Sequence, residues 1–261
     1  MLKLRFSPTL NPLRYFAELA YNGTNYHGWQ RQPNSPSVQS TIETALSTIL
    51  RTETAVTGCG RTDTGVHASQ YYLHFDYDGN FPKAFTRRLN KFLPNDIAIK
   101  SVFEVKAETH ARFDAYYRKY EYHLNFDKNP FTINISYHYH FARDLDISKM
   151  QEVSKLLLKY ENFFSFCKSN SDVKNMLCSL YQAEWKAQKD HLVFHIAANR
   201  FLRGMVRLIV GMCLNVGLGK INIDQVIEAM DQQIRLEKNL SVPAKGLFLT
   251  EVKYPPDKLI L

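Results

Sequence analysis

The segment of the sequence that says most about the fold and the function is Gly58-Cys59-Gly60-Arg61-Thr62-Asp63-Thr64-Gly65-Val66-His67-Ala68. Its glycines permit positive φ angles and allow the backbone to approach a ligand closely. Between them, Arg61 and Asp63 place a cation and a carboxylate one residue apart. Aspartate beside glycine is also common in ordinary polar turns. From these residues alone, a turn is the simpler interpretation and a reactive loop is the alternative.

Apolar patterns on both sides of this loop predict a mixture of strands and helices. Alternation predicts strands over residues 14–21, 70–77, 97–105, 115–126 and 247–254, and a hairpin over 180–198. Helical spacing predicts helices over 36–50, 146–160, 201–218 and 224–232, and another that starts at Pro82 and buries Phe85, Leu89 and Phe92. Strands and helices mix without strict βαβ alternation. We therefore expect an α+β fold with mainly antiparallel sheets, divided near residue 108 into halves 1–108 and 109–261.

Composition narrows the class of protein. The 33 basic and 25 acidic residues give a net charge of +8, which mildly favours a polyanionic partner. The four cysteines form no C-x-x-C pair and have no histidine at metal spacing, so we expect a reduced, cytoplasmic chain without a metal site. Residues 1–21 contain no apolar run of the signal-peptide type, and the apolar stretch 205–218 is too short to span a bilayer. No membrane association is expected.

Seven segments, in order along nearly the whole chain, resemble motifs of the TruA-type tRNA pseudouridine synthases. The first is YNGTNYHGWQ at 21–30, and the second is the loop at 58–68. The others are LN at 89–90 with LPNDI at 93–97, HARF at 110–113, RKYEY at 118–122, FLRGMVR at 201–207 and PAKGL at 243–247. One such match is weak evidence, whereas seven in the correct order are strong evidence.

The resemblance implies a fold and an activity. It implies two domains that resemble RNA-recognition or ferredoxin-like modules, with their sheets joined into one, helices on one side and a basic active-site cleft between the halves. It implies a homodimer that grips one tRNA with both subunits, the dimer interface lying in 109–261. The implied reaction converts uridines at positions 38, 39 and 40 of the anticodon stem-loop to pseudouridine, without a cofactor.

This isomerisation needs a carboxylate beside the ribose, either to add covalently or to stabilise a cationic sugar carbon. The resemblance assigns that role to Asp63. The carboxylate must stay ionised in a pocket that desolvates it, and a nearby guanidinium would favour the charged form. Arg207 is expected to supply this partner, although it could instead extend its head to water. Tyr120 is expected to stack on the flipped uracil, with strand core as the alternative.

Further residues are expected to contact the substrate. Arg61 would fill the space left by the extruded base or hold a phosphate. Leu247 resembles the apolar wall of the pocket, but a leucine at the start of a strand is also typical of core. His67 is expected to form hydrogen bonds that hold the loop rather than act as a general base. The basic side of the helix after Pro82 carries Lys83, Arg87, Arg88 and Lys91 and is either a solvated face or a patch for RNA phosphates, the last three being expected on the tRNA backbone. Arg203 is also expected to contact the tRNA backbone.

Two other classes of protein compete with this interpretation. A noncatalytic RNA-binding protein with two RNA-recognition-like sheets would not need Asp63, but the usual K/R-G-F/Y-G/A-F-V-x-F/Y signature is missing. A zinc deaminase needs H-x-E and P-C-x-x-C, whereas Ala68 and Ser69 follow His67. The G-x-S-x-G motif of hydrolases is also absent.

Overall fold

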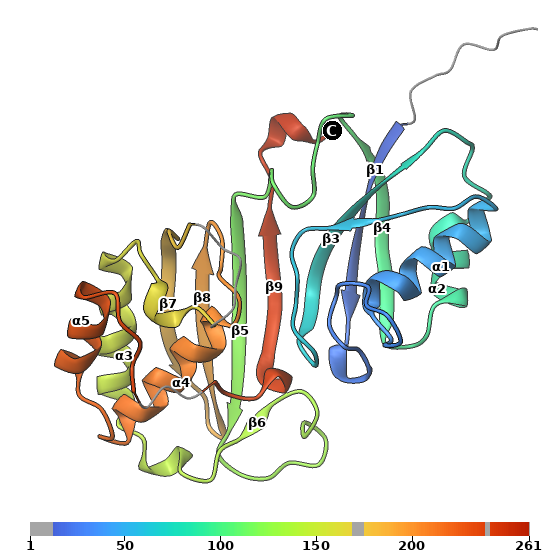
Figure 1. Ribbon diagram of the computed structural model, residues 1–261. Coiled ribbons are helices and arrows are strands. Elements are labelled where there is room, and N and C mark those ends of the chain that lie inside the picture. Colours follow the sequence, from blue (N-terminus) through green and yellow to red (C-terminus); the bar gives the residue numbers. More distant parts are fainter. Residues whose placement is uncertain (1–12, 169–174, 238–240, 261) are drawn as a thin grey trace, which may run out of the picture.

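The computed structural model describes residues 13–168, 175–237 and 241–260, whose strands form one nine-stranded sheet (Figure 1). The strands are β1 (Leu13–Tyr21), β2 (Thr57–Gly58), β3 (His67–Tyr77), β4 (Ile97–Val105), β5 (Tyr117–Asn125), β6 (Tyr137–His138), β7 (Leu180–Ala187), β8 (His191–Ala198) and β9 (Leu247–Lys253). Their order is β4-β1-β3-β9-β5-β8-β7, with β2 on β3 and β6 on β5. Residues 1–12, part of the segment expected to lack a signal peptide, lie outside the described residues.

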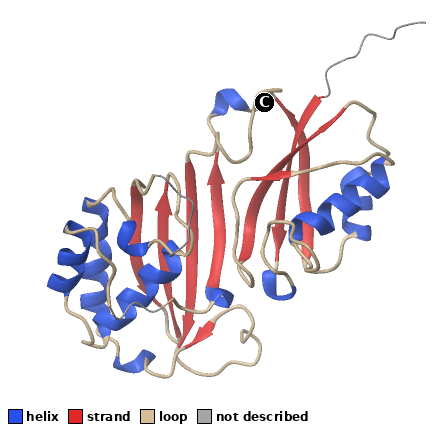
Figure 2. Ribbon diagram, viewed as in Figure 1, coloured by secondary structure: helices blue, strands red, loops and turns tan. Residues whose placement is uncertain are grey.

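Five α-helices of the described residues pack in two groups (Figure 2). They are α1 (Val38–Leu50), α2 (Phe85–Phe92), α3 (Ile147–Leu156), α4 (Met205–Gly217) and α5 (Ile223–Asp231). The first two lie beside β1, β3 and β4, and the other three lie beside β5, β7 and β8 (Figure 1). In the part of the chain that the structure describes, no helix combines the length and the apolar character that crossing a membrane requires.

The last strand, β9, joins the two groups of strands. It pairs antiparallel with β5 over most of its length and parallel with β3, where residues 67–68 face residues 248–249. Each group has its own cluster of buried apolar side chains. Tyr120 on β5 is partly buried and packs against both clusters. A site assembled from both halves of the sequence can therefore form around Tyr120.

The prediction of an α+β fold is confirmed, and the strand expected at 97–105 coincides with β4. The expected burial of Phe92 is wrong, because this side chain is 50% exposed. Phe92 is the last residue of α2, and the chain then turns so that Leu93 is buried instead. The strands β2 and β6 were not expected, since two residues are too few to show an alternating pattern.

His74 on β3 anchors the connector between β4 and β5. Its ring is 7% exposed, and its Nδ1 accepts a hydrogen bond from the backbone N–H of Ala111 at 3.0 Å. Burial, followed by the nearby charges of Arg14 and His110, lowers the pKa of His74 to about 4. Protonation of Nδ1 would remove the acceptor, so the folded chain favours the neutral ring.

The free energy of unfolding is therefore expected to decrease as pH falls from about 6.5 to about 4. In this window the unfolded chain binds a proton at His74 that the folded chain does not, which costs roughly 3 kcal/mol in total. Urea denaturation at a series of pH values measures the effect. His74→Gln should flatten the dependence, and an unchanged slope in this variant would show that other groups cause it.

Candidate active site

The loop between β2 and β3, residues 59–66, is held from several sides. Trp29 donates its backbone N–H to the carbonyl of Thr62 at 3.1 Å, and the Thr62 hydroxyl is hydrogen-bonded to the Tyr21 hydroxyl at 2.8 Å. Tyr71 donates its hydroxyl to the carbonyl of Gly60 at 2.5 Å. Asp63 follows the anchored Thr62 directly, so the surrounding strands determine where its carboxylate projects.

The glycines in and beside this loop were expected to permit positive φ angles and close approach to a ligand, and they serve different purposes. A Cβ atom on Gly58 would lie 2.1 Å from the Tyr71 hydroxyl, so Gly58 makes room for packing within the protein. Gly65 has a φ of +78°, which favours glycine. A Cβ atom on Gly60 would meet no heavy atom within 4 Å. Among these three, Gly60 is the one that leaves open space for an approaching ligand.

Asp63 and Arg207 form an ion pair although 144 residues separate them in the sequence. Arg207 Nη1 lies 3.3 Å from Asp63 Oδ2, and the two side chains are 20% and 33% exposed. Arg207 Nε also donates to the carbonyl of Val242 at 2.7 Å, which orients the guanidinium. Gly204, with φ +73°, turns the chain into α4 and places Arg207 in its first turn. The carboxylate is thus paired with a cation and still reachable from solvent.

Tyr120 lies close to this pair. Its ring makes an edge contact with Phe201, with ring centroids 5.1 Å apart. Burial raises the pKa of Tyr120, and the charge of Asp63 raises it further. The phenol therefore stays neutral near pH 7, which suits stacking or hydrogen-bond donation rather than base catalysis.

His67 is buried at the junction of the two halves. Its Nδ1 accepts from the backbone N–H of Gly23 at 3.0 Å, and its Nε2 lies 3.1 Å from the carbonyl of Lys245. Burial lowers the pKa of His67, in keeping with a neutral ring that donates from Nε2. Both nitrogens have backbone partners, which favours the role within the loop over that of a general base. Leu247 is likewise buried in the core, 6% exposed.

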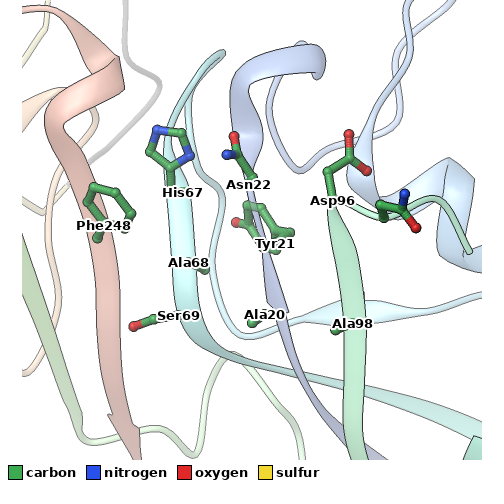
Figure 3. Close-up of a pocket in the computed structure, with 10 residues that line it drawn as sticks. Ala20, Tyr21, Asn22, His67, Ala68, Ser69, Asp96, Ala98 and Phe248 are labelled. Atoms are coloured by element: carbon green, nitrogen blue, oxygen red, sulfur yellow. The ribbon is translucent and has the colours of Figure 1, made fainter. Parts of the chain in front are cut away.

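His67 and Phe248 also border a hollow of about 280 Å³ that Figure 3 shows in close-up. Their rings stack with centroids 4.5 Å apart, and Asn22 and Asp96 lie across from them (Figure 3). Small side chains, among them Ala20, Ala68, Ser69 and Ala98, form the remainder of its lining. Asp63, Tyr120 and Arg207 do not line this hollow, so it is separate from the ion pair and its neighbouring tyrosine.

Comparison with known proteins connects this geometry to a family. A family model described as tRNA pseudouridine synthase matches residues 17–114 and 159–255. These two stretches contain Asp63 and Arg207, whereas Tyr120 lies between them. The chain belongs to the tRNA pseudouridine synthase family. Proteins named tRNA pseudouridine synthase A from Bacteroides fragilis and Porphyromonas gingivalis are each 46% identical to it, over 94% of this chain and 97% and 98% of theirs. The protein of that name from Bacillus subtilis is 34% identical over 93% of this chain and 99% of its own.

The cations expected to contact substrate are all exposed in this member of the tRNA pseudouridine synthase family. Arg61 lies in the loop of Asp63, and Arg203 comes just before the helix of Arg207. Arg87, Arg88 and Lys91 lie together on α2, a separate element that packs beside β1, β3 and β4 (Figure 1). The structure therefore places Arg61 and Arg203 on the segments that carry the ion pair, whereas the three residues of α2 form a separate basic surface.

Sequence reasoning missed Arg118, which is 9% exposed and lies two residues before Tyr120. Its guanidinium donates to four backbone carbonyls, those of Cys59, Arg112, Ala115 and Asn199, at 2.6 to 3.3 Å. It thereby ties the Asp63 loop to the connector and to the end of β8. A signal was present, because Arg118 alternates with Tyr120 and Tyr122 and so lies on the inward face of its strand.

Gly28→Ala is expected to displace the Asp63 loop. Gly28 has a φ of +92°, and an added Cβ would lie 2.5 Å from the carbonyl oxygen of Thr62. We expect pseudouridine formation to fall by roughly 10- to 100-fold, since small misplacements of reacting groups have effects of that size. Gly219→Ala is the matched control, because Gly219 also has a positive φ (+67°) but no atom near its Cβ. Equal losses of activity in the two variants would contradict the explanation.

Proposed function

We propose that this chain converts uridine to pseudouridine in the anticodon stem-loop of tRNA, at positions 38, 39 and 40. Family membership over most of the chain supports this isomerase activity. The observation that carries the chemistry is the pairing of Asp63 with Arg207 at 3.3 Å beside the aromatic ring of Tyr120. Carboxylate, guanidinium and aromatic ring come from three separate segments of the chain, as a folded active site requires.

The reaction breaks the bond between the ribose and N1 of the base, turns the base, and forms a new bond from the same sugar carbon to C5. The proton on C5 is lost and N1 gains one, so no electrons are exchanged and no co-reactant is needed. The carboxylate can add to the sugar, to the base, or stabilise a cationic sugar carbon. In each case it must be ionised, and nothing in the chemistry calls for a metal or a redox cofactor.

In this proposal Asp63 is the nucleophile. Arg207 pairs with Asp63 and holds the carboxylate in place while the substrate excludes water. Tyr120 stacks on the target uracil, since a ring face holds a base without fixing one of its edges. Arg61 lies in the same loop as Asp63, where it can occupy the space that the flipped nucleotide leaves or hold a phosphate of the RNA strand. Leu247, which is buried, supplies part of the apolar wall of the pocket for the uridine.

We also propose that the chain consists of two RNA-recognition-like halves, 1–108 and 109–261, with helices on one side and the active site in a cleft between them. Two separate buried clusters, joined through β9, support this division. The exposed cations Arg87, Arg88, Lys91 and Arg203 would contact tRNA phosphates. A homodimer that holds one tRNA with both subunits, located in the cytoplasm, completes the proposal and rests on the family resemblance.

The proposed activity is tested with unmodified tRNA transcripts. Pseudouridine retains a carbodiimide adduct that uridine loses, and reverse transcription then stops next to it. The purified protein should produce such stops at positions 38, 39 and 40. Tight tRNA binding without any stop would instead support the noncatalytic RNA-binding protein, and stops elsewhere in the tRNA would contradict the proposed target site.

A further inference from the structure

A second hollow, of about 140 Å³, lies beside the Asp63 loop. Arg61 of the loop and Arg112 of the connector between β4 and β5 both line it, together with Gly60 and Trp29. Asp63 does not line it. The hollow is therefore adjacent to the candidate active site without being part of the set of residues that reacts.

Positive charge is concentrated here, and no carboxylate of residues 13–168, 175–237 or 241–260 forms an ion pair with it. Burial lowers the pKa of Arg112, and the nearby charges of Arg61, Arg118 and Arg200 lower it further. None of these four arginines forms an ion pair among the described residues. The arginines that do so are Arg14, Arg31, Arg143 and Arg207. Three arginines therefore lie near enough to Arg112 to repel its guanidinium, and an anion placed beside Arg112 would be stabilised.

Arg118 provides the framework of this hollow. All of its N–H groups point at protein carbonyls, so it has no donor left for a ligand. Two of those carbonyls belong to Cys59, two residues before Arg61, and to Arg112 itself, at 2.9 and 2.6 Å. Arg118 thus fixes the backbone of both walls, while the side chains of Arg61 and Arg112 remain exposed.

The geometry points to a phosphate subsite in which Arg61 and Arg112 together grip one phosphodiester of the RNA strand, next to the extruded uridine. Guanidinium forks match the oxygens of a phosphate in charge and shape. The open space above Gly60 lets the sugar–phosphate backbone approach the loop. The inference rests on the proposed function for the identity of the strand. Arg112 is the new substrate-binding residue, and Arg118 is a positioning residue.

The first test measures how the affinity for an anticodon stem-loop RNA depends on salt. Binding is measured in Asp63→Asn protein, so that no RNA is converted during the titration. Arg112→Gln should weaken binding about tenfold and reduce the slope of log K against log salt by about 0.7 to 1, the value for one lost phosphate contact. The matched control is Arg235→Gln, at an exposed arginine shortly after α5 that forms no ion pair with any residue the structure describes. It should leave the slope unchanged.

The second test locates the phosphate. A series of RNAs carries a single neutral methylphosphonate at each linkage around the target uridine. At one linkage the neutral group should weaken binding about tenfold to the Asp63→Asn protein that retains Arg112. The same group should have no further effect when Arg112→Gln is added, because the guanidinium that contacts the phosphate is already missing. Arg112→Lys, which keeps the charge but loses the fork, should retain part of the coupling at the same linkage and keep the thermal stability of the parent protein.

Additive losses at every linkage, or an unchanged salt slope in Arg112→Gln, would overturn the subsite. These results are independent of turnover. If the wild-type protein forms pseudouridine but no linkage shows coupling with Arg112, the proposed function stands and the phosphate subsite is wrong. If one linkage shows coupling but the wild-type protein forms no pseudouridine, the phosphate subsite stands and the proposed function is wrong.

Discussion

Asp63→Asn is expected to bind tRNA as the wild type does and to form pseudouridine at least about 10³-fold more slowly. Asparagine keeps the size of the side chain but carries no charge, so it can neither add to the substrate nor stabilise a cationic sugar carbon. The ion pair with Arg207, now 3.3 Å long, is lost at the same time. Single-turnover reactions with excess protein measure the chemical step, and filter binding measures the affinity for tRNA.

Asp127→Asn is the matched control for this variant. Asp127 also pairs with an arginine, Arg143, at 2.6 Å, but both side chains are more than 60% exposed. Exposed pairs of this kind contribute little to stability, so the control should keep wild-type activity. Substantial single-turnover activity in Asp63→Asn would show that another group performs the nucleophilic step.

Arg207→Met is expected to slow pseudouridine formation by at least about 100-fold with a smaller effect on tRNA binding. Methionine retains much of the apolar stem but supplies neither the charge that faces Asp63 nor the hydrogen bond to Val242. Arg207→Lys should retain part of the activity, because it restores the charge without the second hydrogen bond. Single-turnover rates and tRNA affinities of the three proteins separate the chemical step from binding.

The double variant tests whether Arg207 acts through Asp63. If it does, Asp63→Asn with Arg207→Met should be no slower than Asp63→Asn alone, because residues that act as a unit are not additive. Thermal melts of each variant check that the fold is intact. Full activity in a folded Arg207→Met protein would show that the ion pair is dispensable.

Local patterns predicted most elements of this fold but not their arrangement. The strand at 97–105 alternates clearly and coincides with β4, since its apolar side chains meet the core on one face. The position of β9 could not be derived in the same way. Its pairing with β3 joins residues 67–68 to 248–249, and a single strand carries no signal for a partner that distant in sequence.

The candidate site shows the same division. Asp63 stands out because glycines flank it, but its pairing with Arg207 was expected from the family resemblance rather than from any local pattern. The inward position of Arg118 follows from strand alternation, yet its carbonyl partners come from segments that only the tertiary fold brings together. Likewise, the packing role of Gly58 depends on Tyr71 and Trp29, whose rings fill the space beside it.

The central claim is that Asp63 drives the exchange of the N1 bond for a C5 bond in tRNA uridine. The most direct measurement uses tRNA with tritium at C5 of its uridines and follows tritium released to water, because forming the new bond expels that atom. The wild-type protein should release tritium in step with pseudouridine at positions 38, 39 and 40, and Asp63→Asn should release none while still binding the tRNA. Equal release by the two proteins would contradict the account.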